Sequence, residues 1–154
     1  MGVGTPEITP SFSSFRTERK GVLRSERSSM PTLKRQLGDL GEEIAANYLK
    51  KLGYQILDRN YRKKCGELDI VTRFKKDIVF AEVKSQREGT KFFPAQNVTY
   101  FKQQRLIRAA RSWLLENKIP PEGQWQIDMI VVKLNSDSGA SEIEHIKNAV
   151  WAGA

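Results

Sequence analysis

Two short apolar segments with charged residues at alternate positions constrain the fold of this chain more than any other feature. The segments are Gly66–Val71 and Ile78–Lys84, and the connection through Phe74–Asp77 is short enough for a hairpin. Side chains of a strand point alternately to its two faces, so Glu82 and Lys84 share one face of the second segment. The other face of that strand is apolar, which predicts a strand that packs on a core.

The charged face of this hairpin predicts a site. Asp69 shares its face of the first strand with Glu67, and it precedes Glu82 and Lys84 of the second strand. Burial of an unpaired charge costs on the order of several kcal/mol, which is comparable to the net stability of a small domain. Mutually paired carboxylates and lysine avoid that cost and could hold a divalent cation. The alternative is a charged edge strand whose Glu82 and Lys84 meet water.

Cysteine and histidine are too scarce to supply the chemistry. Cys65 and His145 are the single cysteine and the single histidine among 154 residues. An internal disulfide and an ordinary zinc cage are therefore excluded, and both residues are expected to be structural. Any catalysis must use carboxylates, lysine and a hard metal ion such as Mg²⁺.

The charge of the chain is concentrated in an N-terminal tail. The net charge is +8, and residues 1–36 carry seven Lys or Arg but only three Asp or Glu. This segment is rich in Ser, Arg, Pro and Gly and is expected to be a disordered extension or a basic arm that adds DNA affinity. Organised sequence begins just after Met30, which is a candidate natural start. Residues 37–154 are expected to form one domain.

Periodicity outside the hairpin predicts an α/β fold, a mixed β-sheet flanked by helices in the order helix, three strands, helix, two strands. A helix between two strands implies a parallel crossover. No apolar run approaches the roughly 20 residues of a membrane span, and the first 20 residues contain no continuous apolar segment, so neither a secretory leader nor a membrane protein is expected. The expected location is the cytoplasm. The remaining predicted elements are helices at Gly38–Leu52 and Thr99–Asn117 and strands at Tyr54–Asn60, Trp125–Lys133 and Ile143–Val150.

The first predicted helix places two neighbouring acids differently. Its apolar stripe comprises Leu40, Ile44, Ala45, Tyr48, Leu49 and Leu52. At 100° per residue, Glu42 lies at the margin of this stripe, whereas Glu43 points away from it. Glu43 is therefore expected to be a solvated surface acid, and Glu42 is expected to reach over the edge of the sheet.

Basic residues later in the chain indicate contact with nucleic acid. Arg87 and Lys91 lie in a predicted loop with two adjacent phenylalanines, which suits phosphate contact and stacking or, alternatively, a plug over the core. Lys102 and Arg105 begin a uniformly basic flank of the second helix, where a solvated face would normally mix charges. Asp128, alone in an apolar strand, needs a hydrogen-bond partner. It is expected to hold a ligand of the site in place rather than to take part in catalysis.

Several motifs of the chain carry a family resemblance: Leu40 to Glu42, Ala45, Tyr48–Leu49, Gly53–Tyr54, Ile56–Leu57, Arg59 to Arg62, Gly66 to Ile70, Val79 to Lys84, Lys102, Arg105–Leu106, Ala109–Ala110, Trp113–Leu114 and Ile127–Asp128. Their order resembles that of the YraN family. These bacterial proteins are regarded as endonucleases related to archaeal Holliday junction resolvases, within the PD-(D/E)XK restriction-endonuclease-like superfamily. The similarity runs from about residue 37 to the C-terminus. The tail has no counterpart in it, and Leu68 stands where the superfamily motif has proline.

The resemblance implies a metal-dependent nuclease site made of Asp69, Glu82, Lys84 and Glu42. Asp69, Glu82 and the backbone carbonyl of Val83 would bind Mg²⁺, or Mn²⁺ in its place, and Glu42 would add an outer ligand. Glu67, on the same face as Asp69, would be an alternative ligand or would support Asp69 through contact with it. Lys84 would stabilise developing charge, because an amine beside two carboxylates is expected to stay protonated.

The expected partner is DNA, including branched DNA of repair or recombination, cut by a homodimer if two strands are cleaved symmetrically. The competing functional class is a nucleic-acid-binding module that keeps the fold without turnover. A plain α/β domain with a charged edge strand is the third alternative.

Overall fold

The structure is a computed structural model that describes residues 29–91, 98–135, 137–139 and 141–150. The chain divides into two compact units, Met1–Met30 and Pro31–Ala154, and each is considered by itself. Residues 1–28 of the predicted tail lie outside the described residues. Every helix and strand described below belongs to the second unit.

The described residues form an α/β fold with the predicted order of helix, three strands, helix and two strands. The elements are α1 (Leu33–Lys51), β1 (Gln55–Lys63), β2 (Gly66–Phe74), β3 (Asp77–Arg87), α3 (Tyr100–Glu116), β4 (Trp125–Leu134) and β5 (Ser141–Val150).

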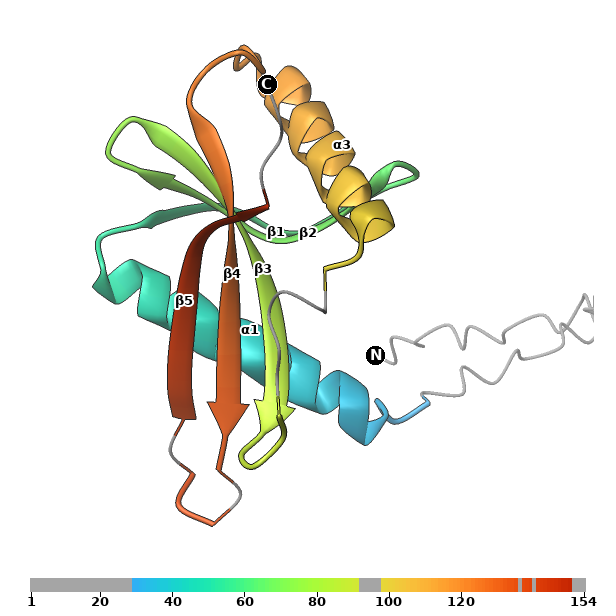
Figure 1. The fold of residues 1–154 in the computed structure, drawn as a ribbon, viewed down its shortest axis with the longest axis vertical. Coiled ribbons are helices and arrows are strands. Elements are labelled where there is room, and N and C mark those ends of the chain that lie inside the picture. The colour runs from blue at the N-terminus through green and yellow to red at the C-terminus, as the bar shows by residue number, and fades with distance from the viewer. Residues whose placement is uncertain (1–28, 92–97, 136, 140, 151–154) are drawn as a thin grey trace, which may run out of the picture. The chain divides into compact units, whose positions relative to one another are not determined.

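The strands form one mixed sheet in the order β1-β2-β3-β4-β5 (Figure 1). Neighbouring strands are antiparallel except β3 and β4, which are parallel. Because α3 connects these two strands, the predicted parallel crossover is confirmed. The last strand is longer than predicted, since β5 has 10 residues and begins at Ser141.

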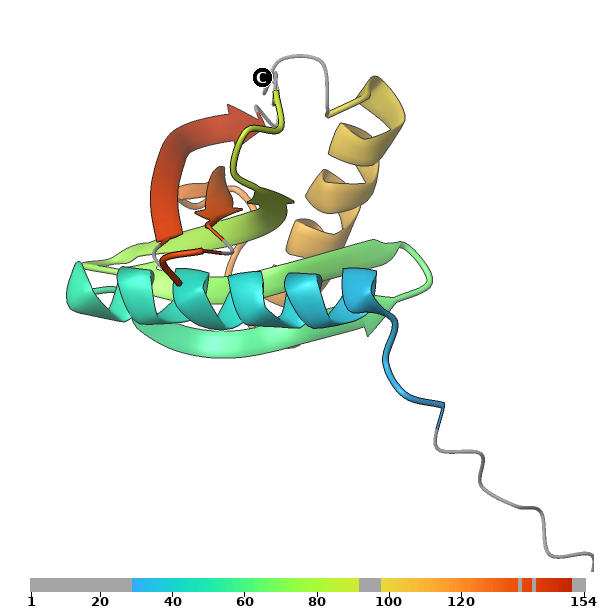
Figure 2. The ribbon, with the colours of Figure 1, turned by 90° about the horizontal axis from the view of Figure 1, so that it is seen from below.

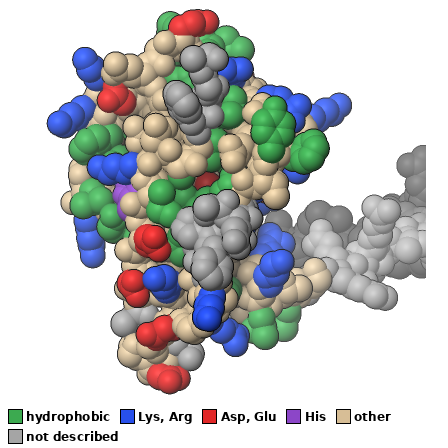
Figure 3. Space-filling view, in the orientation of Figure 1, with side chains coloured by type: hydrophobic (Ala, Val, Ile, Leu, Met, Phe, Trp, Pro, Cys, Tyr) green, Lys and Arg blue, Asp and Glu red, His purple; other side chains and the backbone are tan. Residues whose placement is uncertain are grey.

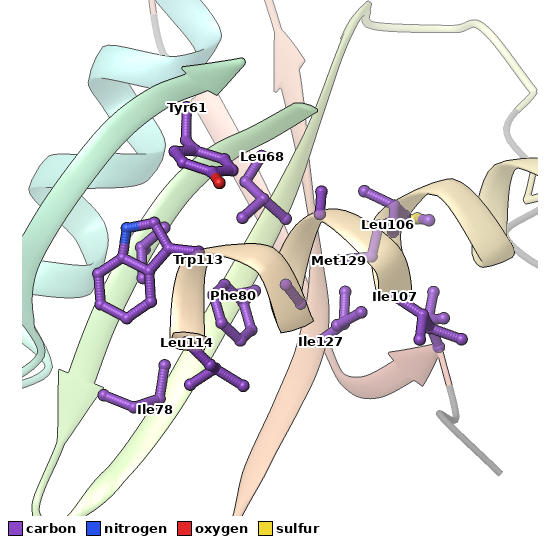
Figure 4. Close-up of a cluster of buried hydrophobic side chains, with 14 of the residues drawn as sticks. Tyr61, Leu68, Ile78, Phe80, Leu106, Ile107, Trp113, Leu114, Ile127 and Met129 are labelled. Atoms are coloured by element: carbon purple, nitrogen blue, oxygen red, sulfur yellow. The ribbon is translucent and has the colours of Figure 1, made fainter. Parts of the chain in front are cut away.

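One hydrophobic core lies between α3 and the sheet (Figure 4). The helix contributes Leu106, Ala110, Trp113 and Leu114, which are buried as their spacing predicted. Phe80 of β3 packs edge-on against Trp113, with ring centroids 5.8 Å apart. This packing fixes α3 across β2 and β3, the two strands that carry the predicted site.

A second core lies on the opposite face of the sheet, beneath α1 (Figure 2). Ala45, Ala46 and Leu49 of α1 are buried there. The predicted apolar stripe was wrong for Leu40 and Leu52, which are 52% and 47% exposed. Leu40 lies half a turn around the helix from Leu49, and Leu52 follows the last helical residue.

The first helix begins at Leu33, five residues before the predicted start at Gly38. The side chain of Thr32 caps it by accepting a 3.3 Å hydrogen bond from the backbone N–H of Arg35. The first turns are mostly exposed, although Leu33, Leu37 and Leu40 follow an i, i+4, i+7 spacing that could have indicated them. Gly38 itself meets no neighbouring atom within 4 Å and does not interrupt the helix.

Two glycines allow the helices to approach the sheet closely. A Cβ at Gly41 of α1 would lie 1.7 Å from Oγ of Ser85 on β3. A Cβ at Gly66 of β2 would lie 2.6 Å from the backbone carbonyl oxygen of Arg105 on α3. Glycine at these positions therefore sets the distance of each helix from the strands that carry the site.

Candidate metal-dependent nuclease site

The site lies where β2 and β3 separate. Their paired register ends at Ile70 and Ala81, and the next residues along the two strands are Asp69 and Glu82. In place of a further strand pair, Oδ2 of Asp69 accepts a hydrogen bond of 2.7 Å from the backbone N–H of Val83. The Asp69 carboxyl thus bridges the opening between the strands and is held beside Glu82.

A change in the direction of β1 accompanies this separation. Asn60 has a φ of +54° and lies between Arg59 and Tyr61, which pair with Ile70 and Leu68 of β2. Asparagine tolerates this left-handed conformation better than most residues. Arg59 contacts α1 through an ion pair with Glu43, whereas Tyr61 belongs to the core under α3. Regular alternation would place Arg59 and Tyr61 on the same face of the sheet. Because they instead contact opposite faces, the two faces of the hairpin exchange at the level of Asp69.

Burial and neighbouring charge keep a proton on Asp69. Burial raises the pKa of Asp69 from 3.8 to about 8, and the negative charge of Glu82 adds to the effect. The hydrogen bond from the Val83 N–H opposes this increase in the pKa, while the charge of Glu42 reinforces it. The proton on Asp69 thus removes the repulsion between two neighbouring carboxyls in a partly dry site.

Glu82 has a basic partner that the sequence reading did not assign to it. Its carboxylate is buried on β3 and forms an ion pair with Nζ of Lys102 on α3. Burial lowers the pKa of Lys102, but Glu82 together with other neighbours outweighs this effect, so the net pKa is raised. In this arrangement, the ammonium group of Lys102 occupies the position beside Glu82 that a cation would favour.

Lys84 lies next to this ion pair and is half-buried. Burial lowers the pKa of Lys84, and the positive charge of Lys102 lowers it further, while Glu82 and Asp69 raise it. The expectation that two carboxylates would set the protonation of Lys84 therefore omitted a neighbouring cation. The lowered pKa moves Lys84 towards a proton-accepting role without establishing one.

The first helix contributes Glu42 to the electrostatics of the site. Glu42 is half-buried and its charge acts on Asp69, whereas Glu43 is exposed and pairs with Arg59 at 2.8 Å. The different placement of these two acids agrees with the helical periodicity. The structure therefore brings Asp69, Glu82, Lys84 and Glu42 together, although Glu42 interacts only through its charge.

A pocket of about 380 Å³ opens beside Glu82, between the hairpin and the start of α3. Glu67, predicted to support the site, lies on the rim of this pocket and is exposed. The side chain of Thr99 caps α3 and accepts a 3.3 Å hydrogen bond from the backbone N–H of Lys102. A helix N-terminus with Lys102 and Arg105 beside it favours a bound anion. The lining residues are Glu67, Glu82, Thr99, Phe101, Lys102, Arg105 and Leu106.

The structure places Asp128 elsewhere. Asp128 pairs with Ala81, whose side chain belongs to the core under α1, whereas Glu82 points towards α3. The carboxylate of Asp128 is fully buried and lies 2.7 Å from Nε2 of His145. The Asn148 backbone N–H also donates to it at 2.8 Å. Asp128 therefore has the hydrogen-bond partners that were expected, but it ties β5 to β4 rather than supporting the carboxylate site.

The predicted nucleic-acid contacts are dispersed. Lys102 and Arg105 line the pocket, while Arg87 and Lys91 are exposed at and beyond the end of β3. Phe92 and Phe93 of the predicted stacking loop lie outside the described residues. Only the two residues on α3 are therefore brought to the carboxylates.

Two residues near Glu82 have roles that the sequence did not predict. Lys102 was expected to contact DNA, but it forms an ion pair with Glu82. This ion pair depends on the packing of α3 against the sheet, which no local sequence pattern reveals. Gln86 continues the row of Glu82 and Lys84, and its Nε2 is buried with no hydrogen-bond partner in the described part of the chain. Alternation along β3 alone could have indicated Gln86.

Within residues 29–91, 98–135, 137–139 and 141–150, no group of three or more His, Cys, Asp or Glu side chains is arranged to hold a metal ion. The candidate ligands are thus two adjacent carboxylates, Asp69 and Glu82, with the backbone carbonyl of Val83 between the strands. Mg²⁺ is commonly held by one or two carboxylates together with water and phosphate oxygens, so this small set is compatible with it.

The fold defines an α/β protein with the layout of a restriction-endonuclease-like domain, a mixed five-strand sheet with a helix on each face. Residues 41–132 match the model of Uncharacterised protein family UPF0102, and the chain belongs to this family, the YraN family that its motifs resemble. The matched residues include every member of the candidate site.

Relatives in the same family are similar along most of their length. A UPF0102 protein of Geotalea daltonii is 42% identical over 73% of this chain and 87% of its own length. A UPF0102 protein of Geotalea uraniireducens is 44% identical over 75% and 89% of the two chains. One from Alkaliphilus oremlandii is 37% identical over 76% and 99%. None of these names states an activity.

No helix of the described region is both long enough and apolar enough to cross a lipid bilayer.

Proposed function

We propose that this protein is a divalent-metal-dependent endonuclease that hydrolyses phosphodiester bonds of DNA. The observation that carries the proposal is the Asp69–Glu82 carboxyl pair at the opening between β2 and β3, with Lys84 and Lys102 beside it. A divalent cation would be a favourable partner for this carboxyl pair, in which Asp69 otherwise stays protonated. A pocket rimmed by basic residues and a helix N-terminus suits a phosphate group.

The residues present fit a hard metal ion. Asp69, Glu82 and the carbonyl of Val83 would hold Mg²⁺ or Mn²⁺, and Glu42 would act from a distance through its charge. When bound, the ion would polarise the phosphodiester and lower the pKa of a coordinated water. For Glu82 to take part, Lys102 must release it and becomes free to contact the substrate phosphate.

The protein's own residues would do the rest by position and charge. Lys84 would orient the attacking water and neutralise the negative charge that develops at phosphorus. Lys102, Arg105 and the first backbone N–H groups of α3 would hold the scissile phosphate beside the carboxylates. Each of these groups lies on a strand or helix that is fixed by one of the two cores, which preorganises the site.

One observation favours a second function, a DNA-binding module without turnover. Lys102 already neutralises Glu82, so the site is electrostatically satisfied without a metal ion. A module of this kind would use the basic start of α3 to bind DNA and would have no metal site that depends on Asp69.

Metal titration and a cleavage panel separate these functions. The purified chain is incubated with Mg²⁺ or Mn²⁺ and linear, single-stranded, supercoiled and four-way DNA. We expect cleavage that is lost in Asp69→Ala, Glu82→Ala and Lys84→Ala while the folded circular dichroism spectrum is retained. Glu43→Gln, an exposed acid next to Glu42, is the matched control and should cleave as the wild type does.

The result has three informative outcomes. Absence of cleavage on every substrate, with no Mg²⁺ binding in calorimetry, would refute the nuclease function. DNA binding without a metal site would support the binding module. Equal cleavage by the wild type and Lys84→Ala would identify a contaminating nuclease.

The proposal extends to the partner and the cellular setting. We propose a cytoplasmic protein that acts on DNA of repair or recombination, including branched DNA. Symmetric cleavage of two strands needs two active sites, which a homodimer with twofold symmetry would provide. Sedimentation of the protein with and without four-way DNA tests this assembly, and a monomer on cleaved four-way DNA would contradict it.

A further inference from the structure

Two aromatic side chains at the start of α3 are exposed beside the candidate site. Tyr100 and Phe101 are 69% and 80% exposed, and their rings contact each other edge-on with centroids 6.1 Å apart. Phe101 also lines the pocket that contains Glu82 and Lys102. Figure 3 shows hydrophobic side chains at the surface beside the start of α3, with basic side chains next to them.

Packing of the described residues does not account for this pair. Neither Tyr100 nor Phe101 belongs to the core under α3, and the first residue that α3 contributes to that core is Leu106. A large aromatic ring gains stability mainly by burial, so two adjacent exposed rings on a well-packed helix indicate a surface that binds something.

The charge around the pair is complementary to a polyanion. Lys102, Arg105 and Arg108 follow on the same helix, and α3 has no acidic residue before Glu116. Aromatic rings interleaved with cations at a helix N-terminus are typical of surfaces that bind the bases and phosphates of single strands. A second copy of this chain or an apolar peptide would not need these cations.

Stacking on these rings requires a base with a free face. Bases inside a continuous duplex are stacked on both faces and are shielded from a protein ring. An unpaired nucleotide, at a gap, flap or branch point, offers its face at little cost. The position of Phe101 on the pocket wall would place such a base next to the phosphate bound by Lys102 and Arg105.

We propose that Tyr100 and Phe101 form a stacking platform for an unpaired base, so that the preferred substrate is DNA with unpaired nucleotides next to the cleaved bond. This inference rests on the proposed nuclease function for the cleavage it specifies. The stacking itself can be measured without cleavage.

The test uses the full chain and DNA that carries 2-aminopurine at one unpaired position, with EDTA present to prevent cleavage. Stacking on an aromatic ring quenches this fluorophore. We expect quenching by the wild type and its loss in the double variant Tyr100→Ala with Phe101→Ala. The variant should bind the gapped DNA roughly tenfold or more weakly, since each stacked base contributes about 1–3 kcal/mol, and should bind intact duplex as the wild type does.

Two control variants make the result specific. Leu115→Ala removes another exposed apolar residue of α3, 64% exposed and at the far end of the helix, and should change nothing. Phe101→Trp keeps an aromatic face and should retain the quenching. Equal weakening on gapped and intact DNA, or unchanged binding by the double variant, would overturn the proposal. A wild-type dimer that becomes monomeric in the double variant would also overturn it, by assigning the surface to self-association.

The outcomes separate the platform from the nuclease. Quenching that depends on Tyr100 and Phe101, without cleavage of the same DNA in Mg²⁺, would support the platform and refute only the nuclease function. Metal-dependent cleavage that is equally fast on gapped and intact DNA, in both the wild type and the double variant, would refute only the platform.

Discussion

The side chain of Asp69 accepts a 2.7 Å hydrogen bond from the backbone N–H of Val83, one residue pair beyond the point where β2 and β3 stop pairing. The carboxyl thus takes over a role that the backbone of β2 would otherwise fill. As a consequence, the strands separate without an unsatisfied donor, and the gap between them is lined with acids. The same residue is both a structural bridge and the candidate metal ligand.

The raised pKa of Asp69 predicts an unusual dependence of stability on pH. Because its pKa is about 8 in the folded state and its ordinary value is 3.8, the folded protein binds more protons than the unfolded chain between these pH values. The free energy of unfolding of the metal-free protein should therefore fall as the pH rises from about 4 to about 8. Asp69→Asn should remove this trend and be more stable than the wild type at pH 8, by about 1–3 kcal/mol.

Urea unfolding at pH 5 and pH 8 in EDTA measures this effect. Glu43→Gln is the control, because Arg59 lowers the pKa of that exposed carboxyl and its contribution has the opposite sign. The explanation fails if Asp69→Asn and the wild type lose the same stability between the two pH values.

Binding of a divalent ion should release a proton from the site. At pH 7, the Asp69 carboxyl is mostly protonated and must lose its proton before it can coordinate a cation. Mg²⁺ affinity should therefore rise with pH up to about 8 and then level off. Calorimetric titration in two buffers of different ionisation enthalpy measures the proton count, which should approach about one at pH 7. Binding without proton release would place the ion elsewhere.

The ion pair between Lys102 and Glu82 should oppose metal binding. Lys102→Met leaves the buried carboxylate without its counter-ion, so the metal-free protein should lose about 1–3 kcal/mol of unfolding free energy. Mg²⁺ should restore more stability to this variant than to the wild type, because it no longer competes with an ammonium group. Thermal unfolding with and without Mg²⁺ measures the difference, and Arg108→Ala on the same helix is the control. A smaller response to Mg²⁺ in Lys102→Met would show that Lys102 does not compete.

The contact of Gly41 with Ser85 predicts a compensating pair of substitutions. Gly41→Ala would place a methyl group 1.7 Å from Oγ of Ser85 and should destabilise the fold by about 1–3 kcal/mol. Ser85→Gly removes both side-chain atoms that the methyl group would meet, so the double variant should be more stable than the sum of the single effects predicts. Denaturant unfolding of the four proteins completes the cycle. Strict additivity would show that the helix avoids the clash by shifting.

The buried contact of Asp128 with His145 predicts a large effect on stability that is remote from the candidate site. His145→Ala leaves a fully buried carboxylate with one partner fewer and opens a cavity under α1, at a cost of about 2–4 kcal/mol. Tyr48→Phe removes only a long contact of 3.4 Å to Nδ1 of His145 and should cost less than about 1 kcal/mol. Chemical unfolding of the two variants distinguishes these effects, and equal losses would contradict this assignment.

Alternation along single strands predicted the central hairpin well. It placed Glu82 and Lys84 on one face, and helical periodicity separated Glu42 from Glu43. Alternation does not hold for Leu68 of β2, which packs under α3 together with Val71 although regular alternation would place it on the face of Ile70. The reversal at Asn60 depends on a left-handed residue in the partner strand, and no pattern within β2 reveals it.

Asp128 shows why alternation cannot relate two strands. Alternation along β4 shows which residues of this strand share a face with Asp128. It does not show whether that face is the face of Glu82, because this depends on the register of β4 against β3. In the structure, Asp128 pairs with Ala81 and Glu82 pairs with Met129, which places the two acids on opposite faces. A shift of one residue would have put them on the same face.

The sequence by itself determined the order of the elements, the parallel crossover and the acidic character of the β2–β3 hairpin, because these follow from side-chain periods of 2 and 3.6 along a local chain. Only the tertiary structure decided that Lys102 forms an ion pair with Glu82, and that Asp128 lies on the opposite face of the sheet and contacts His145. It also decided that Tyr100 and Phe101 are exposed at the start of α3, with Phe101 on the pocket wall. These relationships join residues far apart in the chain. They depend on strand register and on how closely each helix packs against the sheet, and local periodicity encodes neither.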